Sequence, residues 1–454
     1  MKFYGRVKEI ENIERYRILV HKNNSAILVV TGRRRIGKTR LIIESLKNKK
    51  LLYFYVSRKK ENELIAEWSN LIREKLGNVF FGKMTSIDDL LSFLFSYSQK
   101  EPLSVVFDEF QNFNYSNKHV YSVFQKHFDL EKYNSKLLMI FSGSSFSLME
   151  KIFKGNKEPL FGRASDIMQI SYLPIKAQKE FLSDINLDSV LDRIFFFATF
   201  DGVPKYWEHL DETVGRSFKV RLKKILTSKD WIWDEGEMVL KEEFGKDYTT
   251  YYSILSAIAK GRRLLSEIEH FSGISDATAY LHRLDEVYNL IEKKYPVTES
   301  KYTKKRKRRW YVKDNFFRFW FGLIEPKRYL HEIGQKETAA KQILENLNQF
   351  TGRAFEKMII RLFVEENPLN ISFTRLGSYW DRKGEVEIDV VAYDEMSKKA
   401  YFFEVKLDKK RVTQKVVRKL IENSHKIPEL EYYHKFYYTV YPENNEITFN
   451  QIVK

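Results

Sequence analysis

Residues 26–39 read AILVVTGRRRIGKT, and this stretch decides the fold of the first third of the chain. The apolar run Ala26–Thr31 is followed directly by the pattern Gly-x-x-x-x-Gly-Lys-Thr at residues 32–39. Short, continuously apolar strands are typical of parallel sheets that are covered on both faces. A glycine-rich loop of this spacing between a strand and a helix indicates a phosphate-binding loop. The sequence therefore predicts a parallel α/β domain of the P-loop NTPase kind.

The residue types in this loop suit a chain of phosphates. Glycine lets backbone N–H groups approach phosphate oxygens without interference from a Cβ, and the following helix adds a favourable dipole. Lys38 is expected to neutralise β- and γ-phosphate oxygens, and the Thr39 hydroxyl to ligate Mg²⁺. The alternative is a glycine-rich turn with solvated basic residues. The predicted nucleotide-binding residues are Gly32, Arg33, Arg34, Arg35, Ile36, Gly37, Lys38, Thr39 and Arg40.

Two carboxylates follow another apolar run, LSVVFDE, at residues 103–109. Asp108 is expected to hold Mg²⁺, and Glu109 to activate the attacking water as general base. The alternative is that both residues only cap the next helix. Further apolar runs at residues 51–56 and 137–142 complete the set of expected strands, with helical spacing at residues 61–76 and 87–97.

Two further polar positions are candidates for contact with the terminal phosphate. Ser142 and Ser144 follow the apolar run that begins at residue 137, where a capping role explains them equally well. Arg163, in Leu-Phe-Gly-Arg, is a candidate arginine finger or sensor, and a surface salt bridge is the alternative.

Composition restricts the remaining chemistry. The chain has 454 residues, 43% of them hydrophobic, with 78 Lys plus Arg against 61 Asp plus Glu, and it lacks cysteine. The net charge of +17 favours an anionic partner. Without cysteine, disulfides, thiolate nucleophiles and thiolate metal sites are excluded. No apolar run reaches the ~18 residues of a membrane span, and the N-terminus lacks the pattern of a signal peptide. We expect a cytoplasmic protein without membrane contact.

The order of these motifs resembles that of the archaeal-type ATPase family, in the STAND branch of AAA-type P-loop NTPases. The resemblance rests on FYGRVKE at residues 3–9, GRRRIGKT, VVFDEFQ, SGSS, FGR and, after them, DGVP at residues 201–204. It implies binding of ATP or ADP with Mg²⁺, a helical lid, and a place near the adenine for Gly5 and Arg6. Asp201 stands where that family more often has a second glycine.

The rest of the chain divides into further parts. The predicted domains are an ATPase core (1–173), a helical lid (174–247), a winged helix-turn-helix (248–313), a helical linker (314–345) and a C-terminal domain (346–454). The winged helix is the module that usually follows the lid in the resembled family. Its expected wing carries six consecutive basic residues, which are predicted to contact nucleic-acid phosphates, with a solvated loop or an acidic protein partner as alternatives. They are Lys304, Lys305, Arg306, Lys307, Arg308 and Arg309.

The C-terminal domain contains two strand-like segments with charged residues near their ends. Asp389 lies near the end of GEVEIDVV, and Glu404 and Lys406 share one face of the strand AYFFEVK. Together with Glu356, these groups could bind Mg²⁺ and activate water for phosphodiester hydrolysis, although cross-strand ion pairs would look the same. With FFRFWF at residues 316–321, GRAFEK at 352–357 and Tyr379-Trp380, the segments resemble a PD-(D/E)XK nuclease-like domain often fused to archaeal-type ATPases.

The leading interpretation is an ATP-hydrolysing switch that couples its nucleotide state to DNA binding and a nuclease-like effector. The first alternative is a nucleotide-gated DNA-binding or signalling protein with a degenerate C-terminal domain. The second is a ring-forming motor in which Arg163 acts in trans. A nucleotide-dependent oligomer is compatible with both enzymatic readings.

Overall fold

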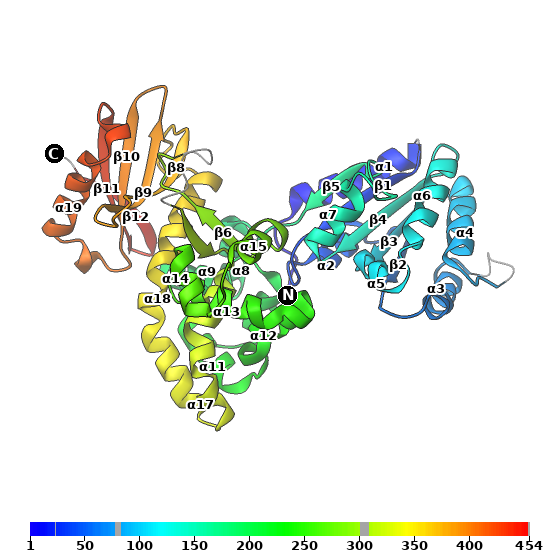
Figure 1. Cartoon of the computed structure of the whole chain (residues 1–454), viewed down its shortest axis with the longest axis horizontal. Coiled ribbons are helices and arrows are strands. Elements are labelled where there is room, and N and C mark those ends of the chain that lie inside the picture. Colours follow the sequence, from blue (N-terminus) through cyan, green and yellow to red (C-terminus); the bar gives the residue numbers. More distant parts are fainter. Residues whose placement is uncertain (23, 78–82, 300–307, 453–454) are drawn as a thin grey trace. The chain divides into compact units, whose positions relative to one another are not determined.

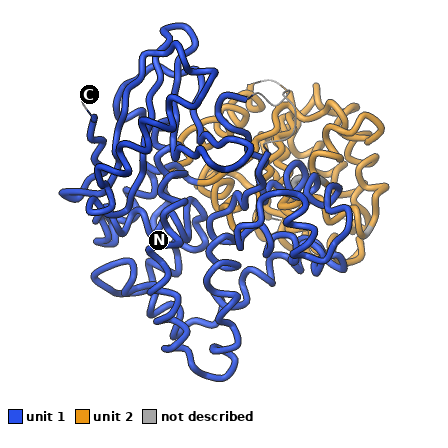
Figure 2. Tube along the Cα trace, turned by 60° about the vertical axis from the view of Figure 1, so that its left-hand side comes forward, with its two compact units in different colours: residues 1–4, 173–454 blue, residues 5–172 orange. Residues whose placement is uncertain are grey.

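The computed structural model describes residues 1–22, 24–77, 83–299 and 308–452, and the chain forms two compact units. The smaller unit comprises residues 5–172, and the larger comprises residues 1–4 and 173–454 (Figure 2). Among the described residues, no helix combines the length and the apolarity that crossing a bilayer requires.

The smaller unit is built on a parallel sheet of five strands in the order β2-β3-β4-β1-β5 (Figure 1). β1, β3 and β4 are buried along their whole length because helices cover the sheet. The strands are β1 (Ala26–Thr31), β2 (Leu51–Tyr55), β3 (Leu103–Asp108), β4 (Leu137–Gly143) and β5 (Asp166–Gln169). The parallel α/β fold predicted from the apolar runs is confirmed.

Helices connect these strands, as parallel strands require. They are α1 (Val7–Lys22), α2 (Lys38–Ser45), α3 (Glu61–Leu76), α4 (Ile87–Lys100), η1 (Phe110–Asn112), α5 (Phe113–Ser116), α6 (Val120–Glu131) and α7 (Phe146–Lys154). Since the strands run in the same direction, β1, β3 and β4 end at one edge of the sheet. The loop of residues 32–39, Asp108 and Gly143 therefore meet at that edge.

The larger unit begins with helices, as the apolar spacing predicts. They are α8 (Ile175–Asp184), α9 (Val190–Thr199), α10 (Pro204–Asp211), α11 (Phe218–Ser228), α12 (Trp231–Phe244) and η2 (Gly245–Asp247). The short segment of residues 1–4 belongs here, where the Tyr4 hydroxyl donates to Asp184 at 2.9 Å.

Three helices and a two-stranded antiparallel hairpin follow. These elements are α13 (Tyr248–Ala259), α14 (Leu265–Ser272), α15 (Thr278–His282), the π-turn η3 (Arg283–Val287), β6 (Ile291–Lys294) and β7 (Arg309–Val312). Gly261 and Gly273 follow α13 and α14 with φ of 94° and 70°, the left-handed conformation in which glycine ends a helix. The two glycines therefore allow the chain to turn after each of these helices.

A mixed five-stranded sheet forms the C-terminal part, in the order β12-β11-β10-β9-β8. β10 and β11 are parallel, and the other neighbours are antiparallel. The strands are β8 (Arg375–Trp380), β9 (Glu387–Asp394), β10 (Lys399–Val405), β11 (His434–Glu443) and β12 (Glu446–Ile452). The helices and turns around them are α16 (Asn315–Phe319), η5 (Trp320–Ile324), η6 (Glu325–Lys327), α17 (Arg328–Glu332), α18 (Lys336–Glu365), η7 (Lys409–Arg411), α19 (Gln414–His425) and η8 (Pro428–Leu430).

The helix α18 joins the helical part of this unit to the C-terminal sheet. It runs without interruption through residues 345 and 346, where the sequence analysis places a domain boundary. Its apolar face continues across that point, and Ala354, Phe355 and Ile359 share one core with Ile194 of α9 and Phe403 of β10. The expected linker and the expected C-terminal domain are therefore connected by one rigid element.

A buried ionic cluster also connects α18 to the helical part. Asp201, which is 1% exposed, accepts hydrogen bonds from Arg361 at 2.8 Å, from Asn315 at 3.0 Å and from Gln178 at 3.2 Å. The departure of Asp201 from the glycine of the resembled family thus has a structural role. Its carboxylate neutralises an arginine that α18 brings into the interior.

Candidate functional site

The glycine-rich pattern folds into a tight loop between β1 and α2. Gly32 has a φ of 155°, and a Cβ at this position would lie 2.6 Å from the carbonyl oxygen of Ile170, so only glycine fits. Gly37 has a φ of 89° and is the N-cap residue of α2. The helix therefore begins at Lys38, and its first backbone N–H groups face the loop, as an anion site requires.

Lys38 is buried within this loop. Its ammonium group donates to the carbonyl oxygens of Gly32 at 2.8 Å and Arg33 at 3.2 Å. A cation held at the centre of the loop is placed to neutralise phosphate oxygens bound by the surrounding backbone.

Gly5 and Arg6, directly before α1, support the same loop. Gly5 and Arg6 both have positive φ, at 62° and 66°, which turns the chain before the helix. The Arg6 guanidinium is buried and donates to the carbonyl oxygen of Ile36 at 3.4 Å, to that of Ser171 and to Glu9 at 2.9 Å. The role near the adenine implied by the resemblance stays a prediction. What the structure shows is that Arg6 supports the loop.

The remaining basic residues of the loop lie around its rim. Arg33 donates to the Tyr172 hydroxyl at 3.4 Å, with its guanidinium 5.8 Å from the ring centre of that tyrosine. Arg35 has a φ of 69°, a conformation that is uncommon outside glycine. Arg34 and Arg40 are half-buried, the latter in the first turns of α2.

Thr39 and Asp108 meet as the predicted magnesium site requires. The Thr39 hydroxyl donates to the Asp108 carboxylate at 2.8 Å, and the hydroxyl of Tyr53 donates to the same oxygen. Burial and the charge of Asp108 raise the pKa of Tyr53, which keeps this phenol protonated as a donor. Hydroxyl and carboxylate oxygens are the hard ligands that Mg²⁺ prefers. The residues therefore fit a magnesium ion.

Glu109 occupies a strained position directly after β3. Its φ is 56°, in the left-handed region that costs energy for a non-glycine residue and often marks a functional site. The Ser144 hydroxyl donates to its carboxylate at 2.7 Å, and the side-chain amide of Gln111 donates to the same oxygen. The carboxylate is thus fixed beside the Asp108 position by groups from the end of β4 and from η1.

Gly143 makes this arrangement possible. A Cβ at Gly143 would lie 2.5 Å from the Gln111 side-chain oxygen and from the side chain of Met149. Glycine at the end of β4 therefore lets Gln111 approach Ser144 and Glu109.

Ser142, a predicted contact of the terminal phosphate, does not join the group around Asp108 and Glu109. Ser142 is fully buried, and among the described residues its hydroxyl has no hydrogen-bond partner. The neighbouring candidate Ser144 makes the contact with Glu109 instead, because side chains alternate between the faces of a strand and the chain turns after Gly143.

Arg163 lies at the opposite edge of the sheet. It forms a bidentate ion pair with Asp129 of α6, at 2.9 and 2.7 Å. Ser165, two residues later, donates its N–H to the carbonyl oxygen of Ile27 near the start of β1. Since β1 carries the loop at its other end, Arg163 is not a sensor for its own loop. The surface salt bridge, the alternative reading of this residue, is what the structure shows.

A second charged constellation lies on the C-terminal sheet. Lys406, directly after β10, places its ammonium 3.3 Å from Asp389 and 2.5 Å from Glu404. The backbone N–H of Val405 donates to Asp389 at 2.8 Å. Burial raises the pKa of both carboxyl groups, while the lysine between them opposes that shift. The structure thus brings together the three residues predicted from the D-x(n)-E-x-K pattern.

Glu356 approaches Asp389 from the middle of α18, rather than from the start of a helix. Both line a pocket of about 120 Å³. Burial and the nearby charge of Asp389 raise the pKa of Glu356 to about 8. Within the described residues, no group of three side chains of the metal-ligating types is arranged to hold a metal ion. Among the described residues, Glu356 therefore does not join Asp389 and Glu404 in a ligand set of three carboxylates.

The predicted basic wing lies largely outside the described residues. Lys304, Lys305, Arg306 and Lys307 fall in that gap, and Arg308 is half-buried just after it. Arg309 is the first residue of β7. Its guanidinium pairs with Glu387 at 3.3 Å and lies 4.8 Å from the ring centre of Trp380, so this arginine packs against the C-terminal sheet.

Sequence reasoning missed Tyr53 and Gln111. Tyr53 lies in the middle of an apolar strand, and its hydroxyl is the one feature of the sequence there that could have indicated a role in the site. Gln111 lies two residues after Glu109, in the segment that resembles the family motif, but only the chain reversal at η1 brings its amide back to the carboxylate.

Known proteins support the ATPase assignment of the N-terminal part. Residues 3–210 match the model of an ATPase domain predominantly from Archaea. Residues 320–420 match a family described as archaeal and bacterial proteins of unknown function. An uncharacterized protein of Methanocaldococcus jannaschii is 34% identical over 430 residues, which cover 91% of this chain and 90% of that protein.

One solved structure shows the same kind of fold, and another has a lower similarity. The Walker-type ATPase of Pyrococcus abyssi is similar with a TM-score of 0.53 and 18% identity, over 70% of this chain and 96% of that one. The ORC2 protein of Aeropyrum pernix, solved as ADPNP and ADP complexes, reaches a TM-score of 0.47 and 13% identity, over 73% of this chain and 96% of that one.

Proposed function

Because this chain belongs to the predominantly archaeal family that joins an ATPase domain to this C-terminal domain, we propose that it binds and hydrolyses ATP with Mg²⁺ at residues 32–39. The observation that carries the proposal is the 2.8 Å contact between the Thr39 hydroxyl and Asp108. It joins the phosphate-binding loop after β1 to the acidic end of β3, which is the arrangement that phosphoryl transfer needs.

Each residue has a distinct task in this proposal. The backbone N–H groups of the loop and the Lys38 ammonium bind the phosphates and neutralise charge that develops on them. Thr39 and Asp108 would hold Mg²⁺, which supplies further neutralisation when bound. Glu109 accepts a proton from the attacking water, and Ser144 and Gln111 fix the direction of its carboxylate.

Hydrolysis in this proposal serves as a switch of the STAND type. ATP orders one conformation and hydrolysis releases it, so that the nucleotide state controls the other parts of the chain. Residues 248–313 act as a winged helix-turn-helix, and residues 304–308 contact nucleic-acid phosphates. A nucleotide-gated binding protein without cleavage, and a ring in which Arg163 acts on a neighbouring copy, are the alternatives.

Steady-state ATP hydrolysis tests the first part. Lys38→Ala and Glu109→Gln should each lower the rate at saturating ATP by at least about 100-fold, and Glu109→Gln should retain ATP binding. Hydrolysis at the wild-type rate in both variants would disprove the assigned site. Arg163→Gln should leave the rate of the monomer within two-fold, because its guanidinium pairs with Asp129 instead.

A second candidate function is metal-dependent cleavage of nucleic acid by the C-terminal part. The observation that favours it is the meeting of Asp389, Glu404 and Lys406 at the ends of two strands. Here Asp389 and Glu404 would hold Mg²⁺, which supplies a Lewis acid when bound, and Lys406 would orient the attacking water.

Cleavage assays test this candidate directly. Wild-type protein and Asp389→Ala are incubated with single- and double-stranded DNA, with Mg²⁺ or Mn²⁺, with and without ATP. Cleavage by the wild type alone supports the nuclease. No cleavage of either DNA by the wild type would leave a binding domain and contradict the cleavage proposal.

A further inference from the structure

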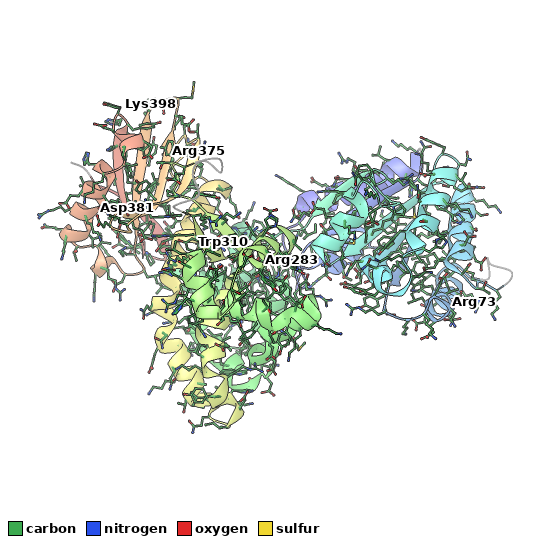
Figure 3. All side chains as sticks on the ribbon, in the orientation of Figure 1. Arg73, Arg283, Trp310, Arg375, Asp381 and Lys398 are labelled. Atoms are coloured by element: carbon green, nitrogen blue, oxygen red, sulfur yellow. The ribbon has the colours of Figure 1, made fainter. Side chains whose placement is uncertain are left out.

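One pocket of the larger unit gathers arginines from three elements. Arg263 follows α13, Arg318 lies in α16 and Arg353 lies in α18, and all three line the pocket that contains Glu356 and Asp389. The hairpin β6–β7 and the strands β8 and β9 complete its wall. In Figure 3, Trp310 marks β7 and Asp381 marks the residue directly after β8.

None of these three guanidinium groups forms an ion pair with a carboxylate of the described chain. Arg263 donates to the Tyr311 hydroxyl at 3.2 Å, and Arg318 donates to the carbonyl oxygen of Phe350 and lies 4.1 Å from the centre of its ring. For Arg353, the described residues supply neither a hydrogen bond nor an ion pair. Elsewhere in this unit, the interior arginine Arg361 has two carboxylate partners.

Four carboxylates also line the pocket, Glu292, Glu356, Glu387 and Asp389, but among the described residues none of them forms an ion pair with the three arginines. Burial and the charges of Arg353 and Arg263 lower the pKa of Arg318 to about 10, and burial and Arg263 lower the pKa of Arg353. Three of these carboxylates have other partners, since Glu292 pairs with Lys294, Glu387 with Arg309 and Asp389 with Lys406. The three arginines are therefore available to bind an anion, and a bound anion stabilises the folded state.

The guanidinium groups and the volume of the pocket restrict the kind of anion that can bind. Guanidinium groups bind phosphate in two-pronged geometry, and arginine is the usual residue for this purpose. A volume of about 120 Å³ corresponds to about four water molecules at ~30 Å³ each. It accepts a single phosphate group.

An adjoining groove extends the pocket towards the surface. It has a volume of about 450 Å³ and shares Arg263 and Trp380 with the pocket. Its lining adds Arg309, Arg382 and Lys383. Basic grooves of this kind follow the backbone of a single strand.

We propose that Arg263, Arg318 and Arg353 bind a backbone or terminal phosphate of a single nucleic-acid strand, whose neighbouring nucleotides lie in the basic groove. The proposal rests on the C-terminal candidate function for the class of ligand. It requires neither ATP hydrolysis nor cleavage, so the strand binds even if the carboxylates are inactive.

Strand binding is measured on full-length Lys38→Ala protein, so that the loop of residues 32–39 does not contribute. The probe is a 5′-phosphorylated oligothymidylate of ten nucleotides with a 3′ fluorophore, followed by fluorescence anisotropy in EDTA. Arg353→Gln and Arg263→Gln, added singly, should each weaken binding by about ten-fold and reduce the salt slope by about 0.7. The matched control is Arg375→Gln, since Arg375 on β8 forms an exposed pair with Glu395 (Figure 3).

Each outcome decides the proposal. Affinity unchanged in both Arg353→Gln and Arg263→Gln, in protein whose thermal melting is unaltered, would overturn it, as would an equal loss in Arg375→Gln. Unlabelled strand should displace the probe, and AMP, inorganic phosphate and the matching duplex should each need at least about 100-fold more. Displacement by AMP or phosphate at strand-like concentrations would overturn the strand as the ligand. Binding in EDTA, together with no cleavage in the assays with Mg²⁺ or Mn²⁺, would count against the nuclease candidate and leave this inference standing.

Discussion

The loop of residues 32–39 and the pocket around Glu356 present cations in opposite ways. In the loop, Lys38 is held by carbonyl oxygens of Gly32 and Arg33, only a few residues away along the chain. In the pocket, Arg263 and Arg353 come from elements separated by the hairpin, α16 and α17. A site built from one contiguous turn depends on backbone geometry, whereas one built from distant elements depends on how those elements pack. Substitutions in the two regions should therefore act in different ways.

The largest effect is expected from Gly143→Ala in the smaller unit. The added Cβ would lie 2.5 Å from Gln111 and Met149, which displaces the amide that fixes Glu109. A misplaced catalytic carboxylate costs about 100-fold in rate, measured as the turnover of ATP hydrolysis. The control is Gly352→Ala in α18, where the new Cβ meets no atom within 4 Å and turnover should not change. Equal turnover in both variants would contradict the role of Gly143.

The second effect concerns the ionic cluster of the larger unit. Arg361→Gln leaves the buried Asp201 without its arginine, which should cost about 3 kcal/mol of unfolding free energy. Segment-resolved hydrogen exchange should show this loss in α9 and α18 while β1 and β3 keep their protection. Lys179→Gln, which breaks an exposed pair with Glu366, should cost less than about 1 kcal/mol. A similar loss in both variants would refute the cluster as a stabilising element.

A third, intermediate effect is expected at the carboxylates of the C-terminal sheet. Lys406→Gln removes the cation between Asp389 and Glu404, and the two half-buried carboxylates then destabilise the unit by about 2 kcal/mol. Urea unfolding measures this change. The rate of ATP hydrolysis should stay within two-fold, which separates the two sites. As a control, Lys409→Gln breaks an exposed pair with Glu443 and should have little effect on stability.

The smallest effect is expected from Tyr53→Phe. It removes the phenolic donor to Asp108, a hydrogen bond to a charged group whose loss is worth about 1.5 kcal/mol. The kcat/KM for ATP should fall by about ten-fold at limiting Mg²⁺. Tyr55→Phe on the same strand is the control, since Tyr55 is exposed and should tolerate the change. No difference between the two variants would remove Tyr53 from the site.

The sequence was sufficient to predict the structure of the contiguous phosphate-binding motif. The bounds of the strand Ala26–Thr31 and the start of α2 at the loop agree with the structure because glycines at fixed spacing prescribe the turn. Arg163 shows the limit of such reasoning. Its motif resembles that of the family, but the edge of the sheet at which it lies depends on where β5 adds to β1.

The amino-acid sequence by itself determined the parallel α/β domain and its phosphate-binding loop, because local backbone preferences and apolar runs encode them. Only the tertiary structure decided that α18 runs through an expected boundary, that Asp201 neutralises Arg361, and that three arginines share one pocket with Glu356. These features join residues far apart in the chain. Their energies come from burial and unbalanced charge, which exist only after the elements have packed.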